Sequence, residues 1–284
     1  MFCLLNLCPM AFVMLFPYGK SILITGGSSG IGRAAAELFA EKGYTVWAAS
    51  RHCEEKTEKL GSGEIISIKM DVCNEESVKS GVEKIASETG LGIVLCCAGM
   101  GIAGAAEDTF EEDARRQFEV NYFGVLRVNR HVLPIFRNQG KGLVLIMSSV
   151  AGRVPLPYQS HYASSKYAVD AYAQALRAET KDFGIRVCII EPGDTKTGFT
   201  DARKMSLPEN SPYREHCESA VARMAHDEEN GASPLKPAMA ALKASEKENP
   251  PVHITVGAMY KAVMVLKRIL PDRLFLGAIG KIYK

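Results

Sequence analysis

The stretch SILITGGSSGIGRA, residues 21–34, decides the fold of this chain. Residues 21–25 are mostly apolar and predict a strand, and the residues after the glycines predict a helix. Between them, Gly26, Gly30 and Gly32 allow a tight turn and a close approach of the backbone to a bound group. The first N–H groups of a helix attract negative charge. This order of strand, glycine-rich turn and helix therefore predicts a pocket for the pyrophosphate of a dinucleotide.

Outward from this turn, short apolar runs alternate with longer amphipathic stretches as far as Pro192. We expect strands at residues 21–25, 44–50, 64–71, 93–98, 142–149 and 186–192. Helical patterns lie between them, such as one ending at Gly43 and one capped by Asn74. Because apolar strands separated by helices are typical of a parallel sheet covered on both faces, we expect an α/β fold of the doubly wound, Rossmann type.

Length and composition bound the class of protein. The chain has 284 residues, 47% of them hydrophobic, and no low-complexity linker, so residues 20–284 are expected to form a single domain. A net charge of +2, spread over the sequence, argues against nucleic acid as a partner. The eight cysteines lack C-x-x-C spacing and the six histidines lack metal-ligand spacing. We therefore expect reduced thiols, a cytoplasmic location and no metal.

The two ends of the chain depart from the alternating pattern. Residues 1–19 are apolar but carry no Lys or Arg and are broken by Pro9, which is unlike a signal peptide or a spanning helix. They are expected to be a loose extension, or to precede the true start at Met10 or Met14. Residues 198–256 are charge-rich and punctuated by prolines, which favours a substrate lid over sheet.

The tail, residues 257–284, is apolar with interspersed lysines and arginines. A basic amphipathic segment can lie on an anionic membrane surface. Packing over the substrate cleft or against another subunit is the commoner fate of an apolar helix. Both interpretations remain open at this point.

The segment SHYASSKYAVDAYAQAL, residues 160–176, places Tyr162 and Lys166 four residues apart. On a helix that spacing puts the two side chains about 6 Å apart on one face, so a phenol and an ammonium can share a site. Tyr158 would lie about 12 Å from Lys166, and Pro157 argues against helix before it. His161 points about 100° away and is expected at the surface.

The pairing has a chemical use. A phenol with a pKa near 10 is a poor base at pH 7, and lowering the pKa by about three units takes about 4 kcal/mol. An ammonium about 5 Å away supplies about 3 kcal/mol at an effective dielectric constant of 20. We therefore expect Lys166 to lower the pKa of Tyr162, which would act as the general acid or base.

The choice of dinucleotide depends on the end of the second expected strand. NAD enzymes usually place an acid there, which accepts hydrogen bonds from the ribose and repels a 2′-phosphate. Here Ser50 and Arg51 follow the strand, and no carboxylate occurs before Glu54. Because an arginine can clamp a phosphate with two parallel hydrogen bonds, NADP(H) is favoured over NAD(H). Asp71 and Val72, after the third strand, are placed to flank the adenine.

These motifs together resemble the short-chain dehydrogenase/reductase family, and the runs GMGIAGAAEDT and QFEVNYFGVLRV resemble its hydroxysteroid and retinol dehydrogenase branch. The matching segments are TGGSSGIG, DV at 71–72, CCAG at 96–99, Asn121 in FEVNYFG, SSVAG at 148–152, YASSK and EPGDTKT at 191–197. The resemblance covers about residues 20–200. Its one departure is Cys97, where the family pattern usually has asparagine. The change puts a local structural hydrogen bond in doubt more than activity.

The resemblance implies roles for individual residues. Ser149, Tyr162, Lys166 and Asn121 match the catalytic tetrad, in which Ser149 would bond the substrate oxygen and Asn121 would hold a water that links Lys166 to solvent. The residues implied to bind the cofactor are Gly26, Ser28, Ser29, Gly30, Ile31, Gly32, Arg51, Asp71, Val72, Cys97, Ala98, Gly99, Asn121, Tyr162, Lys166, Pro192, Gly193, Thr195 and Thr197. A homo-oligomer, dimer or tetramer, is also implied.

The expected substrate is a secondary alcohol or a ketone. The apolar segment RVPLPYQS before the tyrosine, with Met259 and Met264 in the tail, favours a bulky apolar molecule such as a steroid or a lipid-derived ketone. Two alternatives stay open: an enzyme like acyl-dihydroxyacetone-phosphate reductase, and a non-catalytic dinucleotide sensor.

Overall fold

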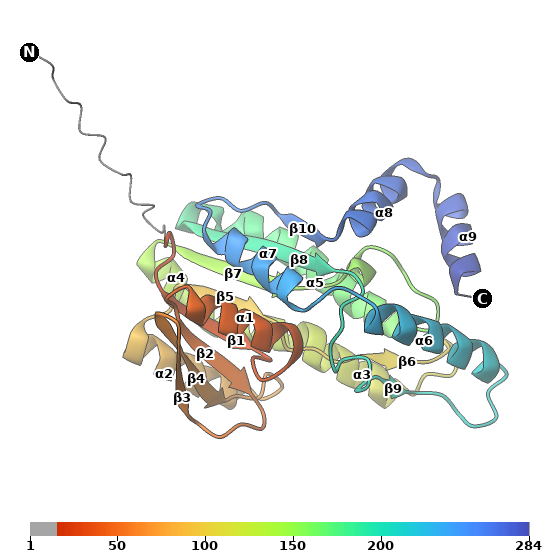
Figure 1. Ribbon diagram of the computed structural model, residues 1–284, viewed down its shortest axis with the longest axis horizontal. Helices are drawn as coiled ribbons and strands as arrows, with labels where there is room; N and C mark the ends of the chain where they lie inside the picture. Colours follow the sequence, from red (N-terminus) through yellow and green to blue (C-terminus); the bar gives the residue numbers. More distant parts are fainter. Residues whose placement is uncertain (1–15, 284) are drawn as a thin grey trace, which may run out of the picture.

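The six expected strands form the centre of one parallel sheet (Figure 1). In the computed structural model, which describes residues 16–283, adjacent strands of this group pair in parallel. Their bounds are β1 Ser21–Thr25, β2 Thr45–Ser50, β4 Gly63–Lys69, β5 Ile93–Cys96, β7 Gly142–Met147 and β8 Ile185–Pro192. The full strand order is β10-β8-β7-β5-β1-β2-β4-β3. The chain winds outward in both directions from β1 and β5, so the doubly wound α/β fold is confirmed.

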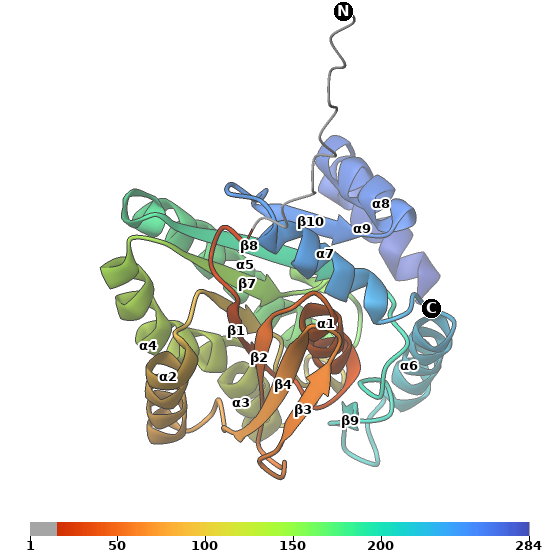
Figure 2. The same cartoon turned by 60° about the vertical axis from the view of Figure 1, so that its left-hand side comes forward.

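Helices cover both faces of the sheet (Figure 2). On one face, α1 (Gly30–Glu41) packs beside α7 (Leu235–Ser245). On the other face lie α2 (Glu75–Thr89), α4 (Gly124–Gln139) and α5 (Ser160–Thr180). Successive strand residues alternate between two apolar clusters, as Leu23 and Ile24 show. The predicted cap of α2 is confirmed, because the Asn74 side chain accepts a hydrogen bond from the backbone N–H of Ser77 at 2.8 Å.

Two further strands extend the sheet at its edges. β3 (Thr57–Leu60) pairs with β4 in an antiparallel hairpin, and β10 (His253–Val256) pairs in parallel with β8. The sequence pattern predicted neither strand. Each has only four residues, and β3 carries charges at two of its four positions.

The expectation that residues 198–256 form a lid is therefore wrong for the second half of this segment. Residues 235–256 contain α7 and β10, which belong to the sheet and its helical layer. Residues 198–234 contain the short strand β9 (Lys204–Met205), which pairs with β6 (Ile102–Ala103), and the helix α6 (Arg214–Glu229). Apolar positions such as Ala238, Ala241 and Leu242 bury α7 against α1, and this packing outweighs the surrounding charge.

Three shorter features join the elements; the first two lie near the carboxyl edge of the sheet, and the third precedes β8 at the opposite edge. The helix α3 (Glu111–Phe118) runs into α4 through a π-helical turn, Glu119–Phe123. A 3₁₀ turn, Val150–Gly152, follows β7, and another, Lys181–Phe183, follows α5. A π-helical turn inside a helix is often found at functional sites.

The carboxyl-terminal segment folds as two helices, α8 (Ala258–Ile269) and α9 (Asp272–Ile282), which stand away from the sheet layers (Figure 1). Of the expected extension 1–19, residues 1–15 lie outside the described residues. Phe16 and Tyr18 pack on the domain, with the Phe16 ring 5.0 Å from that of Tyr44. Within residues 16–283, every helix is too short or too polar to cross a bilayer.

Candidate active site

The glycine-rich turn joins β1 to α1 as the sequence predicts. Gly26 and Gly30 have φ values of 68° and 54°, a backbone conformation that favours glycine. Gly32 is required for a different reason, because a Cβ there would lie 2.1 Å from the carbonyl oxygen of Gly26. The turn is thus built so that only glycine fits at these positions.

The start of α1 offers unpaired donors to an anion. The first backbone bond of the helix runs from Arg33 N–H to Ser29 at 3.0 Å, so the N–H groups of Gly30, Ile31 and Gly32 precede the intrahelical ladder. The Ser29 hydroxyl makes no capping bond, the first turn contains no acid, and Ser28 is exposed beside it. The start of α1 therefore fits a pyrophosphate in four ways. It offers free backbone N–H donors and the positive end of the helix dipole, its glycines allow close approach, and its first turn carries no acidic side chain.

The residues expected at the adenine end lie together at the ends of β2 and β4. Arg51 is exposed directly after β2, and Asp71 and Val72 follow β4, its partner strand. The Asp71 carboxylate accepts a bond from the Cys73 N–H at 3.0 Å, which fixes the turn. Val72 packs against Gly124. These residues lie one and two strands away from the glycine-rich turn.

Thr25 fixes the loop after β5. Its hydroxyl oxygen accepts hydrogen bonds from the N–H groups of Cys97 at 3.1 Å and Ala98 at 3.2 Å. Ala98 packs so closely on the turn that a Cβ on Gly26 would lie 2.9 Å from its Cα. Cys97 takes part through its backbone, and burial raises the pKa of its thiol to about 12. The loop is therefore held without an asparagine side chain at position 97.

Tyr162 and Lys166 occupy the first two turns of α5, which begins at Ser160, after Pro157. Lys166 is buried, and its Nζ lies 5.9 Å from the centroid of the Tyr162 ring. The same ammonium donates to the carbonyl of Met147, at the end of β7, at 3.0 Å. Ser149 follows that strand, and its Oγ accepts from the N–H of Ala151 at 3.1 Å.

The electrostatics of this pair differ from the expectation. Burial raises the pKa of Tyr162 to about 12, a hydrogen bond with Ser149 opposes the shift, and the charges that act on the phenol are Glu228 and Arg203. Burial lowers the pKa of Lys166 to about 8. The predicted lowering of the phenol pKa by Lys166 is therefore not found for the protein alone, in which burial is the largest influence and Lys166 is not among the charges that act on the phenol.

Asn121 lies in the π-helical turn and is fully buried. Its Oδ1 accepts from the Met100 N–H at 2.9 Å, and its Nδ2 donates to the Met100 carbonyl and the Ser165 hydroxyl, both at 3.1 Å. The side chain thus ties the loop after β5 to α5. A Cβ on Gly99 would lie 3.5 Å from the Asn121 amide oxygen and 3.9 Å from Lys166 Nζ, so all three residues meet at one point.

The segment after β8 closes the site from the other side. A Cβ on Gly193, after Pro192, would lie 2.0 Å from the ring of Tyr260 in α8, and the phenol of Tyr260 donates to the Asp194 carboxylate. The Thr195 hydroxyl donates to the Gly193 carbonyl at 2.9 Å.

Thr197 completes this segment. It lies over the glycine-rich turn, since a Cβ on Gly30 would be 3.5 Å from its side chain. The EPGDTKT motif therefore reaches the start of α1.

Phe199 and the pair Arg203–Glu228 belong to the site although the sequence did not single them out. The Phe199 ring lies 5.7 Å from the Tyr162 ring. Arg203, whose side chain is 2% exposed, bonds Glu228 of α6, which also accepts from Thr200 at 2.6 Å. The many charged residues in 198–234 indicate a solvated surface by composition. The path of the loop, which the composition does not reveal, brings Arg203 and Glu228 inward.

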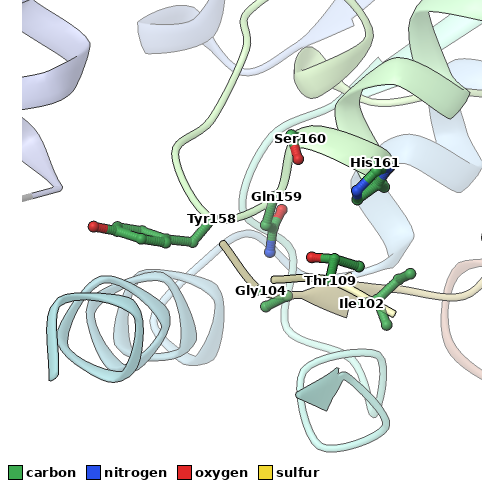
Figure 3. Close-up of a pocket in the computed structure, with 8 residues that line it drawn as sticks. Ile102, Gly104, Thr109, Tyr158, Gln159, Ser160 and His161 are labelled. Carbon is green, nitrogen blue, oxygen red and sulfur yellow. The ribbon is translucent and has the colours of Figure 1, made fainter. Parts of the chain in front are cut away.

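A shallow hollow lies beside the start of α5 (Figure 3). Gly104, Thr109, Gln159 and His161 line it, and the Tyr158 ring points away from it. The Nε2 of His161 is buried without a hydrogen-bond partner in residues 16–283. His161 as a whole is half-buried, so the expectation of a surface residue is correct only in part.

One group of potential metal ligands was found in the described part of the chain. Asp170, Glu191 and His253 bring their ligand atoms within 4.8 Å of one another. His253 already bonds Asp170 at 2.8 Å, and the Arg153 guanidinium lies 3.5 Å from Glu191. The three side chains thus form an ion-pair network with Arg153, in which Glu191 Oε1 is buried without a hydrogen-bond partner in residues 16–283.

Comparison with known proteins agrees with the geometry. The family model described as short chain dehydrogenase matches residues 20–207. A 3-ketodihydrosphingosine reductase of Bacteroides thetaiotaomicron is 36% identical over 266 residues, which covers 92% of this chain and 97% of the relative.

Two solved structures are similar over most of their length. A short-chain dehydrogenase from Streptomyces avermitilis superposes with a TM-score of 0.77 at 29% identity, covering 93% of this chain and 97% of that one. An alcohol dehydrogenase from Thermococcus sibiricus, complexed with 5-hydroxy-NADP, gives a TM-score of 0.67 at 25% identity, covering 85% and 97%. With the matched family model and the long 36% identical relative, these likenesses establish that the chain belongs to the short-chain dehydrogenase/reductase family of oxidoreductases.

Proposed function

We propose that the chain uses NADP(H) to interconvert a ketone and a secondary alcohol on a bulky, lipid-like substrate, with Tyr162 as the proton donor. The observation that supports this most directly is the meeting of Tyr162, Ser149 and the buried Lys166 at the carboxyl edge of the sheet, beside the glycine-rich turn. A ligand at this edge lies at the switch point of the doubly wound sheet, between β1 and β5.

Each residue has a distinct part in the chemistry. A bound nicotinamide supplies or accepts the hydride at the carbonyl carbon. Tyr162 donates its phenolic proton to the substrate oxygen, and the Ser149 hydroxyl hydrogen-bonds that oxygen as negative charge develops on it. The Lys166 ammonium stabilises the phenolate that remains. Asn121 positions both the loop after β5 and α5 through its side-chain hydrogen bonds.

The protonation state of Tyr162 favours the direction of reduction. With its pKa raised to about 12, the phenol keeps its proton at neutral pH. Reduction of a ketone requires a proton donor, whereas oxidation of an alcohol requires a base. The protonated phenol is the form that ketone reduction uses, and the name of the 36% identical relative specifies a reductase, so we propose reduction as the direction.

The preference for NADP(H) is argued from Arg51. This side chain is exposed at the end of β2, where the 2′-phosphate of NADP(H) would lie, and the next acid, Glu54, comes three residues later. The similar alcohol dehydrogenase is named as a complex with an NADP analogue.

The test of this preference is Arg51→Ala. It should weaken NADPH binding about tenfold or more and leave NADH binding within about twofold, because one bidentate phosphate contact is lost. The control is Lys56→Ala, an exposed lysine nearby. Equal losses for the two dinucleotides would contradict the preference.

The substrate proposal has two supports. The name of the 36% identical relative specifies a keto lipid, 3-ketodihydrosphingosine. In this chain the aromatic ring of Phe199 lies beside Tyr162, where the apolar part of a substrate would lie. Assay of 3-ketodihydrosphingosine, a steroid ketone and acyl-dihydroxyacetone phosphate with NADPH and NADH would rank the candidates. Fastest turnover of the ketone phosphate would favour the alternative reductase.

The catalytic proposal is tested by Tyr162→Phe. Loss of the proton donor should lower kcat about 10²- to 10⁴-fold while dinucleotide binding, followed by fluorescence, stays within about threefold. Tyr158→Phe is the matched control, because Tyr158 is the neighbouring tyrosine whose spacing from Lys166 is unsuitable. Unchanged turnover in Tyr162→Phe would favour a dinucleotide sensor instead.

We also propose that the chain forms a homo-oligomer, a dimer or tetramer, as the family resemblance implies. Light scattering of the purified protein measures this directly. A monomer at micromolar concentration would contradict it.

A further inference from the structure

The α8–α9 hairpin, residues 258–282, is poorly packed for an apolar segment. Seven of the fourteen large hydrophobic side chains found exposed in residues 16–283 belong to it. They are Met259, Val265, Leu266, Ile269, Leu274, Leu276 and Ile282. No residue of α8 is buried, and Phe275 is the one buried residue of α9. Large apolar side chains exposed in such number on one short segment indicate an interaction site.

The apolar residues follow the helical repeat. In α8, Met259, Leu266 and Ile269 are seven and three residues apart, which places them on one face. In α9, Leu274 and Ile282 are eight residues apart, which places them about 80° from each other, whereas Leu276 lies on the opposite side and Lys281 lies on the side of Leu274. The helix α8 thus has one apolar face, and α9 exposes apolar side chains on more than one side.

Positive charge accompanies this apolar surface. The hairpin carries Lys261, Lys267, Arg268, Arg273 and Lys281, against a single acid, Asp272. An apolar helical face flanked by lysines and arginines is the pattern of helices that lie in the interface of an anionic bilayer. A second copy of the hairpin is a poorer partner, because its own positive charge would repel the first.

We propose that the α8–α9 hairpin docks on the surface of an anionic phospholipid bilayer. The exposed apolar side chains would enter the boundary between headgroups and acyl chains, and the basic side chains would bind lipid phosphates. The inference does not depend on the substrate or the chemistry proposed above, because vesicle binding is measured without turnover.

The hairpin also lies beside the candidate active site. The helix α8 begins two residues after β10, which runs parallel to β8, so it starts at the carboxyl edge of the sheet. Tyr260 of α8 packs on Gly193 and bonds Asp194, in the segment that closes the site. Docking of the hairpin would therefore bring the site close to the bilayer, from which an apolar substrate could enter.

The test is sedimentation of the full chain with vesicles. The probes are phosphatidylcholine vesicles with and without about a third phosphatidylserine, at low and high salt. We expect binding to the anionic vesicles, little binding to the neutral ones, and weakening by salt. Each basic residue removed should weaken binding about fivefold.

Paired variants separate the hairpin from the rest of the surface. Arg268→Glu with Arg273→Glu, and separately Ile269→Asp with Leu274→Asp, should each lower vesicle binding tenfold or more. Phe110→Asp and Phe183→Asp are matched controls, because these side chains are similarly exposed but lie elsewhere. Thermal unfolding and dinucleotide binding identify any variant that fails to fold.

Three results would overturn the proposal. The first is equal binding of neutral and anionic vesicles, and the second is loss of binding in the controls to the same degree as in the hairpin variants. The third is a change of oligomer size in the hairpin variants without vesicle binding by the wild type. That result would assign the surface to a second copy of the chain.

Discussion

Lys166 combines two properties that rarely occur together, a buried position and a charged function. Its side chain is 7% exposed, and the one hydrogen bond found for its ammonium goes to the Met147 carbonyl. A single neutral acceptor does not compensate for loss of solvation, so the pKa of the ammonium falls to about 8. The group therefore titrates close to physiological pH.

The pH dependence of catalysis follows from that pKa. Because the ammonium supports the phenolate, we expect kcat/KM for ketone reduction to fall as pH rises through about 8, while Tyr162 stays protonated to about 12. Measurement of kcat/KM between neutral and alkaline pH checks this, and Lys166→Met should remove the step. A profile without a decline near pH 8 in the wild type would contradict it.

The same pKa has a consequence for stability. The pKa of Lys166 is lowered from 10.5 to about 8 on folding, so between these values the unfolded chain binds a proton that the native protein does not. The contribution of this group to the free energy of unfolding therefore increases as pH rises from about 8 to 10.5.

Thr25 allows a second prediction at this scale. Thr25→Val keeps the shape of the side chain but leaves two N–H groups of the loop after β5 without their acceptor. We expect the free energy of unfolding, measured in urea, to fall by about 2 kcal/mol. Cys97→Ser should change it by less than about 1 kcal/mol, because the Cys97 backbone holds the loop. A larger loss in Cys97→Ser than in Thr25→Val would show that the thiol matters more than the threonine.

Among the elements, those with a local pattern could be predicted and those defined by a distant partner could not. The predictions of the six central strands and of the α2 cap are confirmed. Both rest on local signals, because an apolar run and a capping Asn74 are visible in the sequence without any distant partner. β10 was missed because four half-buried residues after two prolines become a strand only beside β8.

The site divides in the same way. The pair Tyr162–Lys166 was singled out from its spacing on one helix turn, and Ser149 from the resemblance of the segment SSVAG. Phe199 and the Arg203–Glu228 pair come to the site through the path of a loop, which no local pattern encodes. The raised pKa of Tyr162 also escaped prediction, because it depends on how far the folded chain buries the phenol.

The Arg203–Glu228 pair joins the loop containing β9 to α6 and can be tested at the scale of elements. Arg203→Ala leaves the Glu228 carboxylate in the interior without its cation, and should lower the free energy of unfolding by about 3 kcal/mol. In the double variant with Glu228→Gln the loss should be smaller than the sum of the single losses, because the uncompensated charge is gone. Strictly additive losses would show that the pair does not couple these elements.

At the scale of the whole molecule, the sheet has two unlike edges. β3 carries charged side chains on an exposed strand, which discourages pairing with another chain. On the other side, β10 covers β8, a strand of eight residues of which seven are buried. The two apolar clusters and the helices on both faces are complete only when this last strand is in place.

The late position of β10 in the chain bears on synthesis at the ribosome. Until residues 253–256 leave the exit tunnel, β8 has a bare row of backbone donors and acceptors along an apolar strand. A stalled or prematurely terminated nascent chain would thus have a surface suited to aggregation or chaperone capture, whereas a chain released a few residues later would not.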